Sequence, residues 1–123
     1  MAMIDWNEYH AQVQKRVVEI GRTSPDIIRG YRTTSNAGNN ADLLGPKVRE
    51  LISLAVAVTA RCDGCIVIHT EAALRHGATK EEIVEALGVA ISVNAGAALV
   101  HSGRVLDAIE AKMGVQDGES RPE

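Results

Sequence analysis

The segment between residues 47 and 60 constrains the fold more than any other part of the chain. Apolar side chains, among them Leu51, Leu54 and Val58, fall on nearly every side of it. This pattern is typical of a buried helix, and the segment is too long and too irregular in its alternation for a strand. The chain has no Phe and an aromatic content of 2%, so the core must be built from small aliphatic side chains. We predict an all-α fold.

Helix start and stop signals divide the chain into about six helices. Asp5, Ser24, Gly45, Thr79 and Asn94 have the character and position of N-terminal caps. Gly21 and Gly77 are predicted to end helices, and residues 33–40, rich in Thr, Ser, Asn and Gly, are predicted to form a loop or a frayed helix end. The predicted helices cover residues 6–20, 25–31, 47–60, 65–76, 80–93 and 95–113. Residues 1–113 form one predicted domain, and the polar tail 114–123 is predicted to be disordered.

Composition and charge exclude two classes of partner. The net charge is −3 and no basic patch is present, which argues against nucleic-acid binding. The apolar runs 51–60 and 86–93 contain breaks such as Ser53 and Ser92 and fall short of the roughly 20 residues that span a bilayer. The N-terminus lacks the features of a signal peptide. We therefore expect a cytoplasmic protein with no membrane partner, and a domain this small gains stability from burying surface in an oligomer.

The only two cysteines lie together at the start of a predicted helix. Cys62 and Cys65 are three residues apart, and His69 follows four residues later. This spacing places all three side chains on one face of a helix. A helix N-terminus and a nearby cationic His both favour a thiolate, and a second thiol can trap the first when it is oxidised. The pattern favours redox chemistry, with His69 as a proton relay.

Other interpretations of the cysteine pair remain open from the residues alone. The pair could be half of a zinc site, but only His69, His101 or a carboxylate could complete it. Two inert buried thiols are also compatible with the sequence. A structural disulfide closing so short a loop would stabilise little. Haem attachment requires His where Ile66 stands, and a thioredoxin-like motif requires a βαβ setting that these helical flanks do not provide.

Glu50 is a candidate general base upstream of the cysteines. Helical neighbours such as Leu54, Ala57 and Val58 would desolvate its carboxylate and raise its pKa. On composition alone, a solvent-exposed Glu favoured by the helix dipole is the better interpretation. Twelve residues of straight helix span about 18 Å. Glu50 therefore meets the cysteines only if the chain doubles back after Gly64, or if a neighbouring subunit supplies the contact.

Together these four residues carry a family resemblance. Glu50, Cys62, Cys65 and His69, with eleven, two and three residues between them, resemble the Glu-x11-Cys-x2-Cys-x3-His signature of the alkylhydroperoxidase AhpD-like proteins. These proteins belong to the carboxymuconolactone decarboxylase superfamily. The flanking sequence is also similar, and the resemblance extends over residues 25–112. It implies an AhpD-like helical domain that assembles into a homotrimer or homohexamer.

The resemblance also implies an activity and a role for each residue. The implied activity is that of a thiol-dependent peroxidase or disulfide reductase. It acts on a small hydroperoxide, is re-reduced by a dithiol or redox protein, and needs no cofactor or metal. Cys65 would be the reactive thiolate and Cys62 its resolving partner, while Glu50 and His69 would form the proton relay. True decarboxylases of the superfamily generally lack the cysteine pair, so lactone decarboxylation is disfavoured.

One position departs from the pattern of the reductases. Many of them carry a second His directly before the reactive cysteine, where this chain has Gly64. The departure predicts a weaker peroxidase or one with a different substrate, and it keeps a slow redox sensor or binding module as the alternative function. Asp63 beside it disfavours a thiolate. The remaining histidines are predicted to lie outside the site: His10 on a solvated face, His76 at an exposed helix end and His101 in a packing or interface position.

Overall fold

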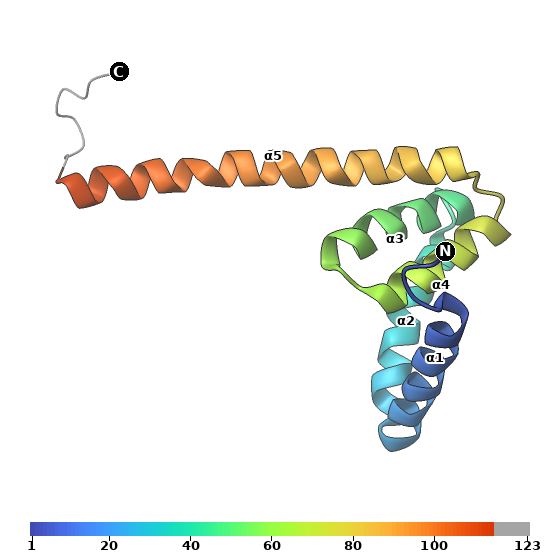
Figure 1. Ribbon diagram of the computed structural model, residues 1–123. Coiled ribbons are helices and arrows are strands. Elements are labelled where there is room, and N and C mark those ends of the chain that lie inside the picture. The colour runs from blue at the N-terminus through green and yellow to red at the C-terminus, as the bar shows by residue number, and fades with distance from the viewer. Residues whose placement is uncertain (115–123) are drawn as a thin grey trace. The chain divides into compact units, whose positions relative to one another are not determined.

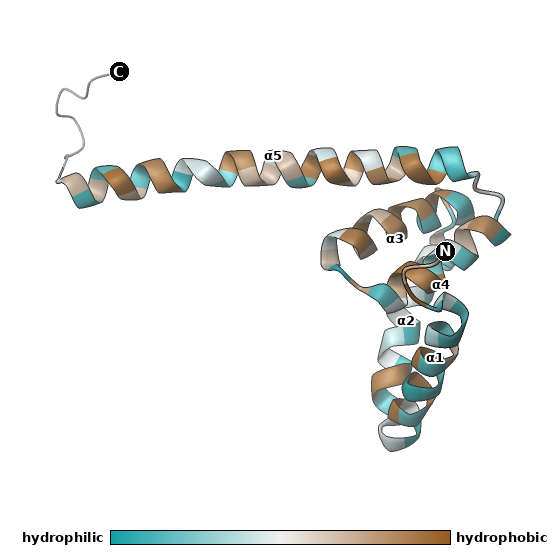
Figure 2. Cartoon of the chain, in the orientation of Figure 1, coloured by the Kyte–Doolittle hydropathy of each residue, from teal (hydrophilic) through white to brown (hydrophobic). Residues whose placement is uncertain are grey.

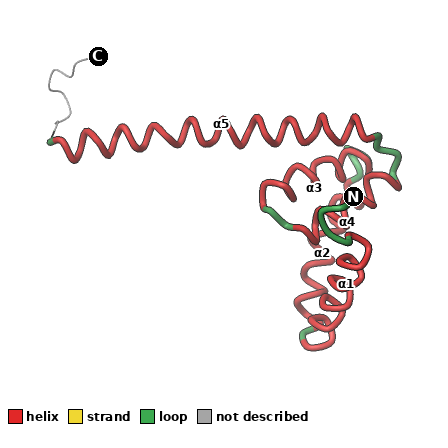
Figure 3. The backbone as a smooth tube through the Cα atoms, viewed as in Figure 1, coloured by secondary structure: helices red, strands yellow, loops and turns green. Residues whose placement is uncertain are grey.

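The protein is described from a computed structural model that covers residues 1–114, and within that range it contains only helices and no strand (Figures 1 and 3). The predicted all-α class is therefore confirmed. There are five described helices instead of about six. They are α1 (Trp6–Thr23), α2 (Pro25–Ala41), α3 (Pro46–Ala60), α4 (Asp63–Arg75) and α5 (Lys80–Met113).

The missing helix boundary is the one predicted at Asn94. Instead of capping a sixth helix, Asn94 lies inside α5, which runs unbroken for 34 residues. Asn is unfavourable in a helix interior by less than 1 kcal/mol relative to Ala, so it breaks a helix only where the backbone has another reason to turn. No Pro is present between Lys80 and Met113, and the helix continues.

Residues 33–40, which were predicted to form a loop or a frayed helix end, are instead regular helix. These residues belong to α2, which ends only where Asp42 adopts a left-handed conformation with φ of 45°. The hydroxyls of Thr33 and Thr34 donate to the carbonyl oxygens of Arg29 and Gly30 at 2.9 and 3.3 Å. Hydrogen bonds of this kind satisfy the polar side chains within the helix itself, so a polar composition does not force a loop here.

Residues 1–90 form one compact unit. Its core consists of Leu54, Ala73 and Ala78, with Leu51 and Ile83 packed against them. The packing of α3 on α4 is the most extensive contact between helices, and α1 packs against both α2 and α4. The core is built from small side chains, as the absence of Phe predicts. Although α3 is apolar on nearly every side, only Leu54 and Ala57 of that helix are buried within the chain.

A second unit begins at Ile91, within α5. Its apolar side chains are largely exposed; Leu99 and Val100, for example, are 76% and 80% exposed. Figure 2 shows hydrophobic residues spread along α5 after its hydrophilic first turn, with hydrophilic residues between them. Ser92 was expected to break the apolar run, but it lies within the unbroken helix α5. By length and composition alone, α5 could cross a membrane. Helices covered by protein pass the same test. The prediction of a disordered tail concerns residues beyond 114, which lie outside the described part of the chain.

Candidate redox site

The site is formed by a chain reversal between α3 and α4. Arg61, directly after α3, takes a left-handed conformation with φ of 56°. The next N–H, that of Cys62, donates to the carbonyl oxygen of Ala57 at 3.1 Å. The chain then enters α4 at Asp63, and α4 packs along α3. The chain therefore doubles back, as contact with Glu50 requires, but it does so before Gly64 and not after it.

This reversal brings Glu50 of α3 against His69 of α4. Oε2 of Glu50 lies 2.7 Å from Nδ1 of His69, and the two side chains are 21% and 29% exposed. Because a carboxylate can only accept, Nδ1 donates in this hydrogen bond. The contact holds the imidazole ring in one orientation and leaves Nε2 as its second functional atom. Glu50 is thus not the solvent-exposed first-turn residue that composition favoured, and it reaches His69 within one chain.

The two cysteines are bonded to each other at the start of α4. Cys62 and Cys65 form a disulfide, with their Cα atoms 5.2 Å apart. Cys62 is also the N-cap residue of α4, and its Sγ accepts the backbone N–H of Cys65 at 3.1 Å. Both residues are partly exposed, which argues against a pair of inert, buried thiols. His69 lies one helical turn beyond Cys65, on the same side of α4.

The zinc alternative lacks a set of ligands in this part of the chain. Among residues 1–114, no three or more His, Cys, Asp or Glu side chains are grouped in a way that could hold a metal ion. His101, one of the candidate zinc ligands, belongs to the second unit, where it is exposed. His76 is exposed at the C-terminal end of α4.

Helix α1 lies against the side of α4 that carries Gly64. A Cβ atom added to Gly64 would stand 3.5 Å from Cγ1 of Val13, an ordinary van der Waals distance. An alanine therefore fits at this position, whereas a large side chain would meet Val13. The local reason for a small residue here is the packing of α1 and not the backbone conformation, since Gly64 is helical.

His10 is one residue whose environment we predicted wrongly. Its side chain is only 14% exposed, and Nδ1 lies 3.4 Å from Oε2 of Glu71 on α4. His10 and Val13 are three residues apart and so share one side of α1, which is the side packed on α4. That spacing was visible in the sequence, but nothing in the sequence indicated that α4 would be the neighbour.

The sequence model of the carboxymuconolactone decarboxylase family matches residues 25–108. The chain belongs to the carboxymuconolactone decarboxylase family. The match covers the whole of α2 and extends through α3 and α4 into α5, and so includes Glu50, both cysteines and His69. It confirms the resemblance to AhpD-like members of the superfamily.

Relatives of similar length support this membership in the carboxymuconolactone decarboxylase family. An uncharacterized protein of Haemophilus influenzae is 43% identical over 104 residues, which cover 85% of this chain and 92% of the relative. Uncharacterized protein 4 in the cox locus of Paracoccus denitrificans is 40% identical over 92 residues, covering 75% and 83%. A crystal structure of a carboxymuconolactone decarboxylase family protein from Legionella pneumophila, in its apo form, is similar with a TM-score of 0.69 and 27% identity, covering 86% of this chain and 95% of that one.

Proposed function

We propose that the protein is a thiol-dependent peroxidase or disulfide reductase that passes electrons through Cys62 and Cys65. One observation carries the proposal: the bonded cysteine pair lies on the first turn of α4, and the same helix holds His69 in a hydrogen bond with Glu50. A thiol pair next to a carboxylate–imidazole pair has the parts that redox exchange requires, namely a nucleophile, a resolving thiol and a proton carrier.

In the oxidative half of the reaction, the reduced pair meets a small hydroperoxide. The thiolate of Cys65 attacks the terminal peroxide oxygen, the O–O bond breaks, and the alkoxide leaves and takes a proton from His69 to become an alcohol. Cys65 is now a sulfenic acid. The thiol of Cys62 then attacks the sulfur of Cys65, a disulfide forms, and the hydroxyl leaves as water. Two electrons have passed from the pair to the peroxide.

In the reductive half, a dithiol or a dithiol redox protein restores the pair. One thiolate of the reductant attacks a sulfur of the disulfide and forms a mixed disulfide, and the other cysteine leaves as a thiolate. The second thiol of the reductant then resolves the mixed disulfide. The reductant ends as a disulfide, and both cysteines of the protein are reduced. In each half, Glu50 orients His69 so that a proton can be carried to or from the reacting sulfur.

The assay is peroxide-dependent oxidation of a dithiol at neutral pH. We expect Cys65→Ser to abolish turnover, because it removes the attacking sulfur. We expect Glu50→Gln to lower turnover by roughly 10²-fold, the usual contribution of a positioned acid or base. His76→Gln, which alters an exposed His on the same helix, is the control and should leave turnover unchanged. Equal rates for the wild type and Cys65→Ser would reject the proposal.

A slow redox sensor is the second candidate, and the contact of Val13 with the helix surface at Gly64 favours it. Because position 64 is a glycine close to Val13 of α1, the residue directly before Cys65 supplies no imidazole to speed proton transfer. A sensor would form the disulfide on exposure to peroxide but would not turn over repeatedly. Sustained turnover with excess dithiol would therefore reject this candidate and leave the enzyme.

We also propose that the protein is cytoplasmic and works as a homotrimer or homohexamer. The exposed apolar surface of α5 supports assembly, because monomeric soluble proteins rarely leave a large contiguous apolar patch in water. A second copy of the chain is the occupant that this proposal assigns to that surface.

A further inference from the structure

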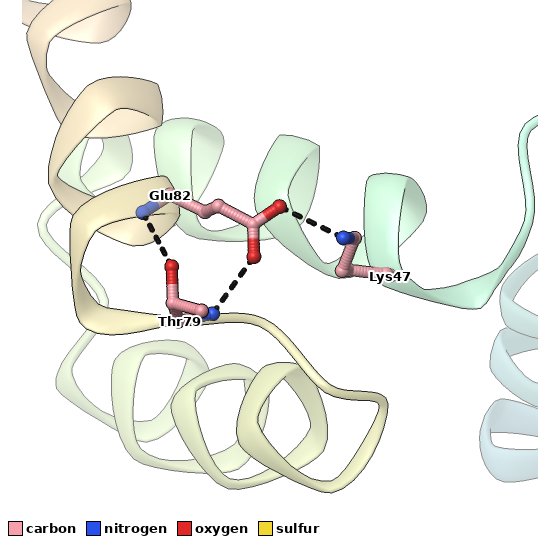
Figure 4. A network of polar contacts seen from close by, with 3 residues as sticks. All are labelled: Lys47, Thr79 and Glu82. Carbon is pink, nitrogen blue, oxygen red and sulfur yellow. Dashed lines mark hydrogen bonds and ion pairs between the residues drawn. The ribbon is translucent and has the colours of Figure 1, made fainter.

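A network of polar contacts joins the first turn of α3 to the first turn of α5 (Figure 4). Nζ of Lys47 lies 2.8 Å from Oε2 of Glu82. The other carboxylate oxygen, Oε1, accepts the backbone N–H of Thr79 at 2.9 Å, and Oγ1 of Thr79 accepts the N–H of Glu82 at 3.1 Å. The predicted capping box is therefore present, and it carries an additional bond to a residue 35 positions earlier in the chain.

The position of Lys47 in the first turn of α3 is not explained by helix propensity. A cation in the first turn of a helix is opposed by the positive end of the helix dipole, and Lys47 follows directly on Pro46, the first residue of α3. Glu82 compensates for this position. The hydrogen bond from Lys47, followed by the backbone N–H of Thr79, lowers the pKa of Glu82 from its ordinary value. Both carboxylate oxygens are in use, so Glu82 is held from two directions.

The Lys47–Glu82 ion pair also lies within one turn of α3 from Glu50 of the candidate site. Lys47 and Glu50 are three residues apart and are therefore neighbours on one side of the helix. Leu51, next along, packs against the same core as Ile83, the residue that follows Glu82. The turn of α3 that carries Glu50 is thus fixed at one end by the Lys47–Glu82 ion pair and at the other by the core beneath Leu51 and Leu54.

We propose that Lys47 is a positioning residue for the Glu50–His69 hydrogen bond. Through Glu82 it fixes the first turn of α3 to the start of α5, and so keeps the Glu50 carboxylate at its 2.7 Å distance from Nδ1 of His69. Lys47 touches no reacting atom in this account. The inference rests on the proposed function for its importance in catalysis, but the geometric claim stands without it.

The test follows the imidazole of His69 by NMR in the disulfide form of the full chain. Long-range ¹H–¹⁵N correlation of histidine ring nitrogens reports which nitrogen carries the proton, and His69→Gln identifies the signal. Glu50→Ala defines the pattern without the hydrogen bond. We expect Lys47→Met to move the His69 signals toward that pattern, whereas Lys47→Arg, which keeps a cation, retains the wild-type pattern. Turnover should fall about 2- to 30-fold in Lys47→Met, the range of coupling seen for mutations outside a site.

Two further variants make the test decisive. Glu82→Gln has one carboxylate oxygen replaced by a donor, so it can cap α5 or bind Lys47 but not both; it tests the inference should Lys47→Met fail to fold. Glu81→Gln removes one carboxylate from the same turn of α5 and is the matched control, expected to match the wild type. Unchanged His69 signals in the folded Lys47 or Glu82 variant would overturn the inference. Shifted signals in a protein without peroxidase turnover would uphold it while rejecting the proposed function.

Discussion

At the scale of single residues, Cys62 has two structural roles, one in the disulfide and one as a helix cap, and the choice of substitution can remove one and keep the other. Its sulfur is bonded to Cys65, and the same atom caps α4 by accepting the N–H of Cys65 at 3.1 Å. Cys65 has no comparable capping role among the described contacts. Replacing one cysteine or the other therefore has different consequences for stability, even when the loss of the disulfide is the same.

We expect Cys62→Ser and Cys62→Ala to differ in stability once both are compared under reducing conditions. Serine can accept the same N–H, whereas alanine leaves it without a side-chain partner, which costs about 1 kcal/mol in the free energy of unfolding. Urea unfolding followed by circular dichroism measures the difference. The matching pair Cys65→Ser and Cys65→Ala should show no such cap effect. Equal stability of the two Cys62 variants would show that the sulfur is not a functional cap.

Gly64 offers a second test at this scale. Gly64→Ala should raise the free energy of unfolding by up to about 1 kcal/mol, because alanine favours the helix and its Cβ fits at 3.5 Å from Val13. Gly64→His should lower it by about 1–3 kcal/mol, the usual cost of overpacking. Thermal unfolding of both variants measures these changes.

The double variant Val13→Ala with Gly64→His tests the cause. Removing the Val13 methyl groups makes room for the imidazole, so the double variant should be more stable than the sum of the two single changes predicts. The control is the double variant Val17→Ala with Gly64→His. Val17 lies on the same helix as Val13 but is not among the contacts of position 64. Strict additivity with Val13→Ala would contradict the packing account.

At the scale of helices, local signals were sufficient where the chain itself supplies the interaction. The capping box at Thr79 and the helix start at Pro46 were predicted because each depends on residues within one turn. The family resemblance implied that Glu50 and His69 form a proton relay, but local signals did not predict their contact. That contact depends on a reversal at Arg61, a residue type that gives no indication of a left-handed conformation. The four candidate site residues were selected from their spacing and the family resemblance, whereas the Glu50–His69 geometry required the packing of α3 on α4.

The Lys47–Glu82 ion pair gives the start of α5 a pH-dependent stability. The pKa of Glu82 is lowered in the folded protein, so this carboxylate stabilises the fold above the ordinary Glu pKa of about 4.3. That contribution is lost as the pH falls through the lowered value. The stability difference between wild type and Glu82→Gln should therefore be constant from neutral pH down to about pH 5 and then shrink on further acidification.

Urea unfolding at a series of pH values measures this difference. Glu81→Gln serves as the control for the loss of one carboxylate in the same turn. A difference for Glu82→Gln that stays constant down to strongly acidic pH would contradict the role assigned to Lys47, since protonation would then leave the contact unaffected.

At the scale of the whole molecule, the dominant feature is the extent of α5. Its 34 residues correspond to about 51 Å of helix, and only Ala90 among them is buried within the chain. No sequence signal distinguishes a helix covered by its own chain from one covered by a second copy, because both need the same apolar residues. The division of residues 80–113 into two predicted helices had a separate, local cause, which was the assignment of Asn94 as an N-terminal cap.

We expect the wild type to have a solution mass of three or six times the chain mass of 13.1 kDa. Leu99→Glu should lower this mass, because it places a charge on the exposed apolar surface of α5. Ile27→Glu, which changes another exposed apolar side chain, on α2, is the control and should leave the mass unchanged. Light scattering after size-exclusion chromatography in detergent-free buffer provides the measurement. A monomeric wild type, or one that requires detergent, would contradict the proposed assembly.

The reversal at Arg61 sets a mechanical limit on how the site can vary. Glu50 lies on α3 and His69 on α4, and the two helices are joined by a short turn. The contact between the two side chains therefore depends on how each helix is rotated about its axis as well as on the distance between the helices. Adding or deleting one residue of α3 between Glu50 and this turn would rotate the carboxylate by about 100° around the helix axis, away from the imidazole. The interval of eleven residues between Glu50 and Cys62 therefore determines the direction in which the Glu50 carboxylate points. A point substitution in this interval leaves the direction of Glu50 unchanged, whereas an insertion or deletion removes the contact between Glu50 and His69.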